Sequence, residues 1–147
     1  GHYNEGDVAE CQGHCFLLLG QPAMAERRLL EARRLQGDLR TRSRSYAEAD
    51  LALAYLRRPK PDVEAAVQAG YNAVELAGRL SSHRISQKLD ELDREMSRFA
   101  QTVAVREWRH RMAELRPRQP SAPRRTARSA ARSPAHATAR ITAGAAV

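Results

Sequence analysis

The sequence predicts an all-α protein, a right-handed stack of antiparallel helix hairpins with about six helices and a disordered C-terminal tail. Three observations support this prediction. The 147 residues are rich in Ala, Leu, Arg and Glu, which lose little free energy on entering a helix. Val, Ile and Thr are sparse, which argues against an extended sheet. A pattern of small and aromatic residues also recurs about forty residues along the chain, as stacked hairpins require.

The repeated pattern places a small residue on each helix of a hairpin and an aromatic residue one turn after the first. Small side chains let two helix axes approach closely, and the aromatic ring fills the space beside the contact. The first copy comprises Gly13, Phe16, Gly20, Ala25, Leu29 and Ala32, and the second comprises Ala52, Tyr55, Ala66, Gly70 and Ala73. Because one hairpin cannot bury its apolar face alone, such repeats stack, and arrays of them bind partners more often than they catalyse.

Proline, glycine and capping residues divide residues 7–115 into six predicted helices. These run from Asp7 to about Gly20, from Pro22 to about Gln36, from an Arg-rich segment before Ser45 to Leu56, from Asp62 to about Leu80, from Ser82 to Phe99 and from Thr102 to Leu115. Asp7 with Glu10, and Ser45 with Glu48, have the spacing of capping boxes. Proline suits the first position of the second helix, and the Pro-Lys-Pro segment at 59–61 separates the third helix from the fourth.

The last two predicted helices carry the most regular apolar seams. Their apolar residues are Ile85, Leu89, Leu92, Met96 and Phe99 in the first, and Val105, Trp108, Met112 and Leu115 in the second. Spacings that alternate between three and four residues place each set on one helix face. We therefore expect Phe99 and Trp108 to belong to the core rather than to a ligand-binding platform.

The charge of the chain divides it into two parts. Residues 116–147 hold seven arginines and no acidic residue, which leaves 18 basic and 17 acidic residues in residues 1–115. The net charge of +8 therefore belongs mainly to the tail and does not indicate that the folded part binds nucleic acid. We expect residues 1–115 to form the helical repeat domain, and the Arg/Ala/Pro/Ser-rich residues 116–147 to be disordered because they have little to bury.

The two cysteines, Cys11 and Cys15, lie one helical turn apart, where disulfide geometry is unfavourable. Unpaired cysteines favour a reducing compartment, so we expect a cytoplasmic protein. The chain contains no apolar run of about 18 residues and no signal-peptide pattern, and no membrane association is expected. It opens without Met, almost directly into a helical pattern, so we expect it to be a piece of a longer protein.

The repeated residues resemble tetratricopeptide-type helical repeats over residues 7–115. The chain is also similar to the C-terminal repeat region of helix-turn-helix transcriptional regulators from high-GC Gram-positive bacteria. Those regions often show a Gly-His-Cys motif and a Ser-x-Arg motif that opens a late helix. The corresponding segments here are Gly13-His14-Cys15 and Ser82-His83-Arg84. No helix-turn-helix motif occurs in this chain, so the resemblance implies a DNA-binding domain upstream of it.

The resemblance implies a protein- or peptide-binding module, the regulatory or oligomerisation part of a regulator. It places His14 on the concave groove formed by the first helix of each hairpin. The expected groove residues are His14, Tyr46, Leu53, Arg84 and Lys88. The implied partner is a protein or peptide, and a homo-oligomer is left open. DNA is an implied partner only through the missing upstream domain, or weakly through the tail.

The groove and metal interpretations have simpler alternatives. For His14 an ordinary, partly exposed histidine is the favoured alternative, because isolated histidines are common on helix surfaces. With Cys11 and Cys15 it could contribute metal ligands, but zinc needs four and no second pair is present. We therefore expect no metal and no cofactor, and expect the cysteines to be buried at a helix contact.

Other features leave two rival functions open. Arginines are dense between residues 27 and 44, but acidic residues interleave with them, which favours a solvated helix face with local pairing over a nucleic-acid surface. The Arg-rich tail could contact nucleic acid, although it has no aromatic residue to stack on bases. A purely structural scaffold is the other alternative. The sequence lacks zinc-protease, phosphate-loop and serine-hydrolase motifs, so we do not expect an enzyme.

Overall fold

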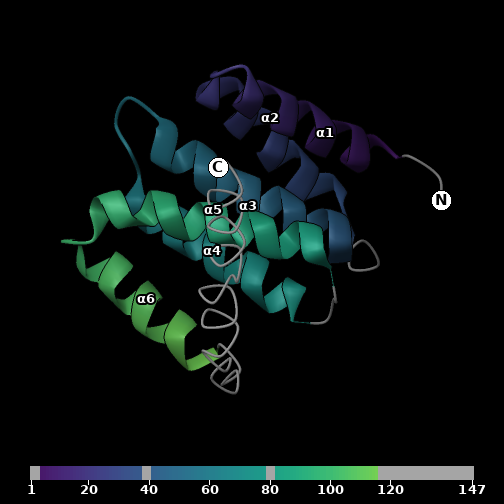
Figure 1. Ribbon diagram of the computed structural model, residues 1–147. Helices are drawn as coiled ribbons and strands as arrows, with labels where there is room; N and C mark the ends of the chain where they lie inside the picture. The colour runs from purple at the N-terminus through teal and green to yellow at the C-terminus, as the bar shows by residue number, and fades with distance from the viewer. Residues whose placement is uncertain (1–3, 38–40, 79–81, 116–147) are drawn as a thin grey trace, which may run out of the picture. The chain divides into compact units, whose positions relative to one another are not determined.

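The computed structural model describes residues 4–37, 41–78 and 82–115, and within these ranges it contains only helices and their connections. The elements are α1 (Glu5–Leu18), α2 (Pro22–Leu35), α3 (Thr41–Arg57), α4 (Val63–Ala77), α5 (His83–Met96), the short 3-10 helix η1 (Ser97–Phe99) and α6 (Val103–Leu115) (Figure 1). The predicted all-α class and the six helices are therefore confirmed for these residues. The predicted disordered tail, residues 116–147, lies outside them.

Residues 1–113 form one compact unit, and residues 114–147 form another, of which only the last two residues of α6 are described. In the first unit, α1 contacts α2 extensively, and α3 contacts α4 in the same way. Helix α3 is central, because it also contacts α1, α2 and α5 (Figure 1). The first four helices are thus paired as predicted for hairpins, whereas α5 and α6 are not in comparable contact. Right-handed tetratricopeptide-like stacking stays a prediction.

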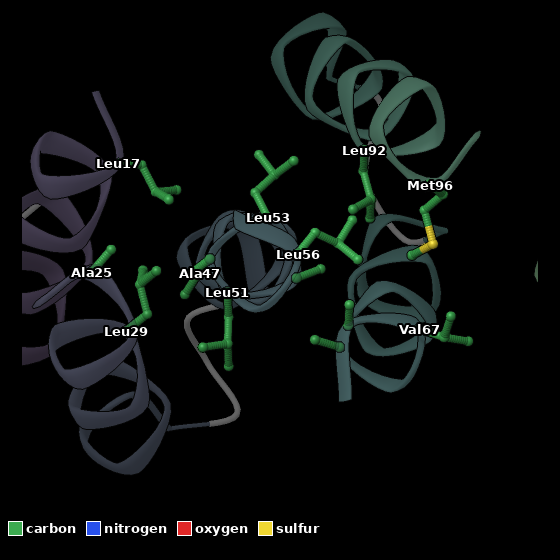
Figure 2. Close-up of a cluster of buried hydrophobic side chains, with 14 of the residues drawn as sticks. Leu17, Ala25, Leu29, Ala47, Leu51, Leu53, Leu56, Val67, Leu92 and Met96 are labelled. Carbon is green, nitrogen blue, oxygen red and sulfur yellow. The ribbon is translucent and has the colours of Figure 1, made fainter. Parts of the chain in front are cut away.

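The hydrophobic core surrounds α3. Leu51, Leu53 and Leu56 are almost completely buried. Figure 2 shows Leu29 of α2 on one side of this helix and Leu92 of α5 on the other. Burying one leucine side chain contributes about 1.5–3 kcal/mol to folding. Because α3 packs against other helices on both sides, this packing determines where the polar side chains of α3 lie relative to α1 and α5.

Two glycines allow close helix contacts. A Cβ atom at Gly13 would lie 2.6 Å from Cδ2 of Leu29, which matches the contact predicted between α1 and α2. At Gly70 a Cβ atom would lie 2.8 Å from Cζ3 of Trp108. The indole of Trp108 thus occupies the space that a side chain at position 70 would need. Trp108 is accordingly buried in the core, as predicted.

Two predicted capping boxes are wrong. Helix α1 begins at Glu5 with Asn4 as its cap: the backbone N–H of Asp7 donates to the Asn4 side chain at 2.9 Å, and that of Asn4 donates to Asp7 at 3.4 Å. Asp7 therefore occupies the third helical position. Ser45 lies inside α3, where its hydroxyl donates to the carbonyl of Ala73 at 3.2 Å. This long-range bond replaces the local cap that the sequence predicted.

Other helix ends follow the prediction more closely. The backbone N–H of Ala65 donates to the side chain of Asp62 at 3.0 Å, so Asp62 caps α4 at the predicted helix start. The hydroxyl of Thr102 accepts from the N–H of Val105 at 3.3 Å. The apolar seam of α6 ends earlier than predicted, because Leu115 is exposed. Among the described helices, none has both the length and the apolar composition that crossing a bilayer requires.

Candidate functional site

Six polar side chains from three helices come together in what we call the α1–α3–α5 cluster. They are Glu10 and His14 of α1, Tyr46 and Asp50 of α3, and Arg84 and Lys88 of α5. Each helix contributes two residues that are four apart. Residues at this spacing lie one turn apart on the same helix face. Three helix faces therefore meet in one polar region beside the core.

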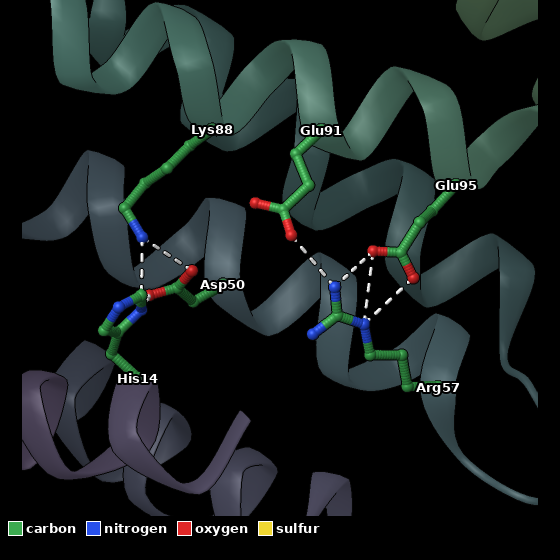
Figure 3. Close-up of polar contacts among 6 residues, drawn as sticks. All are labelled: His14, Asp50, Arg57, Lys88, Glu91 and Glu95. Carbon is green, nitrogen blue, oxygen red and sulfur yellow. Dashed lines mark hydrogen bonds and ion pairs between the residues drawn. The ribbon is translucent and has the colours of Figure 1, made fainter. Parts of the chain in front are cut away.

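The centre of the cluster is a buried ion pair. Asp50 is only 1% exposed, and its Oδ1 accepts a hydrogen bond from Nζ of Lys88 at 2.8 Å. The other carboxylate oxygen lies 3.1 Å from Nδ1 of His14 (Figure 3). Burying such a pair costs desolvation energy that its attraction only partly offsets, so the pair is weak evidence of a stabilising role. Its geometry does, however, tie α3 to both α1 and α5.

His14 has two neighbours at one ring nitrogen. Its Nδ1 lies 3.1 Å from Oδ2 of Asp50 and 3.4 Å from Nζ of Lys88. One nitrogen cannot donate to a carboxylate and accept from an ammonium group at once. We assign the proton to Nδ1, because the contact with Asp50 is shorter and a carboxylate can only accept. In neutral His14, Nε2 is then the ring's hydrogen-bond acceptor.

Arg84 forms the exposed edge of the cluster. Its guanidinium carbon lies 4.6 Å from the centre of the Tyr46 ring, within the range of a cation–π contact. Tyr46 is buried, and its hydroxyl lies 3.1 Å from that of Ser82. The ammonium group of Lys88 lies on the same ring, 5.9 Å from its centre. Arg84 thus presents a positive charge to solvent directly above the buried groups.

Glu10 is buried, but only one of its two carboxylate oxygens accepts a hydrogen bond in the described part of the protein. It is 6% exposed, and its Oε1 has no hydrogen-bond partner in the described part of the protein. Its Oε2 accepts a weak hydrogen bond from Sγ of Cys11 at 3.7 Å. Burial raises the pKa of Glu10, and the charge of Asp50 raises it further, while Lys88 and Arg84 act in the opposite direction. Perturbed carboxylates of this kind are common at functional sites.

The raised pKa of Glu10 also affects stability. Folded protein holds the proton of Glu10 more tightly than unfolded protein does. Stability therefore falls as the pH rises through the window between the ordinary glutamate pKa, about 4.3, and the higher folded value. Above that window the folded state carries the whole cost of the buried carboxylate.

A second set of ion pairs positions α5 on α3. Nη2 of Arg57 lies 3.0 Å from Oε1 of Glu91, and Nε lies 2.9 Å from Oε1 of Glu95 (Figure 3). These groups are partly exposed, so each pair contributes about 0–1 kcal/mol. Their main effect is on register, since they hold α5 where Lys88 reaches Asp50.

Four of the five predicted groove residues belong to the cluster: His14, Tyr46, Arg84 and Lys88. Leu53 does not, because it is buried in the hydrophobic core (Figure 2). The sequence analysis overlooked Asp50. The available signal was that Asp50 directly precedes the apolar segment from Leu51 to Leu56.

The predicted environment of the cysteines is wrong. Cys11 and Cys15 are exposed rather than buried at a helix contact, because the side of α1 that packs on α2 is the one that carries Gly13. Within the described ranges, no three His, Cys, Asp or Glu side chains are grouped as a metal site requires. One arginine of α2 pairs locally as predicted: Arg34 donates two hydrogen bonds to Glu31, at 2.6 and 3.1 Å. Arg33 instead donates to Glu48 of α3, at 2.7 and 2.8 Å.

The cluster places charged groups of both signs side by side. It combines two buried carboxylates, a buried ammonium group, an exposed guanidinium group and an imidazole that is partly exposed. In the described part of the chain, the polar contacts of the His14 ring are with Asp50 and Lys88 and not with a hydroxyl or thiol group. Comparison of the sequence with protein-family models, curated proteins and solved structures finds no match in any of the three.

Proposed function

We propose that this protein is a helical module that binds a protein or peptide at the α1–α3–α5 cluster, and that it does not act as an enzyme. One observation carries the proposal. Four residues expected to line a groove, His14, Tyr46, Arg84 and Lys88, lie together although they come from three helices. Buried charges are costly to keep, and a role in recognition explains why the fold contains them.

The accessible groups of the cluster favour an acidic partner. Arg84 is exposed, and the side chain of His14 is about one third exposed. A guanidinium group binds a carboxylate through two parallel hydrogen bonds. The contact of Arg84 with the Tyr46 ring and the contact of His14 with Asp50 hold these two side chains in place. We infer that the partner places an aspartate, a glutamate or a C-terminal carboxylate over Arg84.

Binding at this position would influence the packing of the helices. The cluster joins α1, α3 and α5, so a ligand that prefers one arrangement of these helices shifts their equilibrium toward it. We propose that such a shift is the signal, and that the protein is the regulatory part of a cytoplasmic transcriptional regulator. A helix-turn-helix domain encoded upstream in the same gene would support this role, and its absence from the full-length gene product would argue against it.

A peptide-display selection on the immobilised protein tests the binding proposal. We expect acidic peptides to be enriched, and Arg84→Ala and His14→Ala to weaken their binding about tenfold or more, as measured by fluorescence anisotropy. Arg94→Ala is the matched control, since it removes an exposed arginine from the last turn of the same helix. The proposal fails if no peptide is enriched, or if the control variant loses as much affinity as Arg84→Ala.

A further inference from the structure

Helices α1, α3 and α5 each carry a stripe of four residues with the same spacing of four, three and four, which places them on one helix face. The stripes are Ala47, Leu51, Ala54 and Arg58 on α3, and Ile85, Leu89, Leu92 and Met96 on α5. In the internal repeat, Gly13 corresponds to Ala52, 39 residues later. The equivalent stripe on α1, which ends at the C-cap of the helix, is therefore Val8, Gln12, Cys15 and Leu19. We call these four residues the outer α1 face.

The α3 stripe is covered by the hairpin that precedes it. Its first three members are at most 2% exposed. Ala47 and Leu51 lie around one narrow space with Leu29 of α2, and Figure 2 shows Leu29 beside Ala47. At the other end of the stripe, Nε of Arg58 lies 3.7 Å from Oε2 of Glu26, which also belongs to α2. Helix α2 thus contacts the stripe near both of its ends.

The α5 stripe is covered in the same way by α3 and α4. Ile85 is buried and belongs to one hydrophobic cluster with Ala73 of α4. Leu92 is also buried, and a Cβ atom at Gly70 of α4 would lie 3.3 Å from its Cδ2 atom. Met96 is buried as well. On both helices, therefore, the stripe is the surface on which the preceding hairpin packs.

The outer α1 face has no such cover within the described ranges. Val8 is 44% exposed, Leu19 is 68% exposed, and Cys15 is exposed as well. The side-chain oxygen of Gln12 already accepts a hydrogen bond from Nε of Arg28, at 2.8 Å. In an array of hairpins, the terminal hairpin needs a polar outer face to stay soluble. The outer α1 face contains no charged residue, which is typical of a surface on which a further hairpin packs.

The connections between hairpins indicate where the covering segment lies in the sequence. Residues 36–40 connect α2 to α3, and residues 78–82 connect α4 to α5. A connection of the same length before Glu5 places the end of the covering helix directly upstream of Gly1. We propose that a further helix hairpin, encoded directly upstream of Gly1 in the same gene, packs on the outer α1 face. This contact goes beyond peptide binding at the α1–α3–α5 cluster and does not depend on it.

The outer α1 face also specifies the chemistry of the hairpin that covers it. The second helix of that hairpin should carry small residues seven apart, as α2 does at Ala25 and Ala32. Leu19 stands where α3 has Arg58, whose partner on α2 is Glu26. A carboxylate buried against Leu19 would lose its hydration without gaining a partner. The upstream residue equivalent to Glu26 should therefore be apolar.

Thiol labelling tests this contact, because a covered cysteine reacts more slowly than an exposed one. Iodoacetamide labelling of Cys15, quantified by mass spectrometry, is compared between the 147-residue chain and the full-length gene product. We expect Cys15 to react about tenfold or more slowly in the full-length protein. Val103→Cys is the matched control, because Val103 is 61% exposed but lies on α6. The new cysteine should react at similar rates in both proteins.

Two changes to the full-length protein should restore the fast reaction of Cys15. The first is deletion of the 39 residues upstream of Gly1, which is one repeat length. The second is Val8→Glu, because a carboxylate on the outer α1 face opposes an apolar contact. Val8 is exposed in the 147-residue chain, so that chain should tolerate Val8→Glu, which circular dichroism checks.

Three outcomes would overturn the proposal. The first is equal labelling of Cys15 in the 147-residue chain and in the full-length protein. The second is protection that survives the deletion, since another part of the protein would then cover α1. The third is protection that appears in the 147-residue chain as its concentration rises, since a second copy would then be the cover. None of these measurements involves a peptide, so failure of this proposal and failure of the proposed function are distinguishable.

Discussion

The buried ion pair of the α1–α3–α5 cluster can be tested by removing its cation. Lys88→Met keeps most of the aliphatic chain but leaves the carboxylate of Asp50 without its 2.8 Å partner, at a position only 1% exposed. Removing one member of a buried pair costs about 3–5 kcal/mol. His14 still lies 3.1 Å from the same carboxylate, so we expect the lower end of this range, about 3 kcal/mol.

Urea unfolding followed by circular dichroism measures this loss. The matched control is Lys60→Met, which removes the only other lysine from an exposed loop and should change stability by less than about 0.5 kcal/mol. Asp50→Asn in the Lys88→Met background removes the uncompensated charge. It should restore part of the stability, which gives a coupling energy of about 0.5–3 kcal/mol in a double-mutant cycle.

Two results would refute this reasoning. A loss below about 1 kcal/mol in Lys88→Met would mean that Asp50 does not depend on its ammonium partner. Additive effects of Lys88→Met and Asp50→Asn would mean that the two residues do not interact in the folded state. Either result would also remove the reason for treating the cluster as a fixed site.

Three further predictions concern burial and packing. Glu10→Gln should stabilise the protein, by an amount that grows from pH 4 to pH 8 as the wild-type carboxylate loses its proton, in urea titrations across this range. Gly13→Leu should lower the melting temperature strongly, because the new side chain would overlap with Leu29. Gly37→Ala should leave the melting temperature nearly unchanged, because nothing lies within 4 Å of the added Cβ atom. Gly70→Ala should cost about 1–3 kcal/mol and change the fluorescence of the tryptophan beside it; unchanged fluorescence and stability would contradict that contact.

The parts of the fold that could be predicted from sequence are those set by local interactions. Helix identity follows from composition and periodicity, and the contact at Gly13 follows from a small residue with an aromatic residue one turn later. The start of α4 was predicted correctly at Asp62, which follows the Pro-Lys-Pro segment. The sequence analysis predicted Asp7 rather than Asn4 as the cap of α1. Both residue types can cap a helix, and the choice between them depends on where the helix begins.

The parts that could not be predicted depend on partners distant in the sequence. Ser45 has the spacing of a helix cap, but its hydroxyl bonds to Ala73, 28 residues away. Asp50 looks like one more acidic residue on a helix until α5 brings Lys88 against it, 38 residues later. Sequence spacing shows that two side chains share a face of one helix, but it does not show which faces of three helices meet.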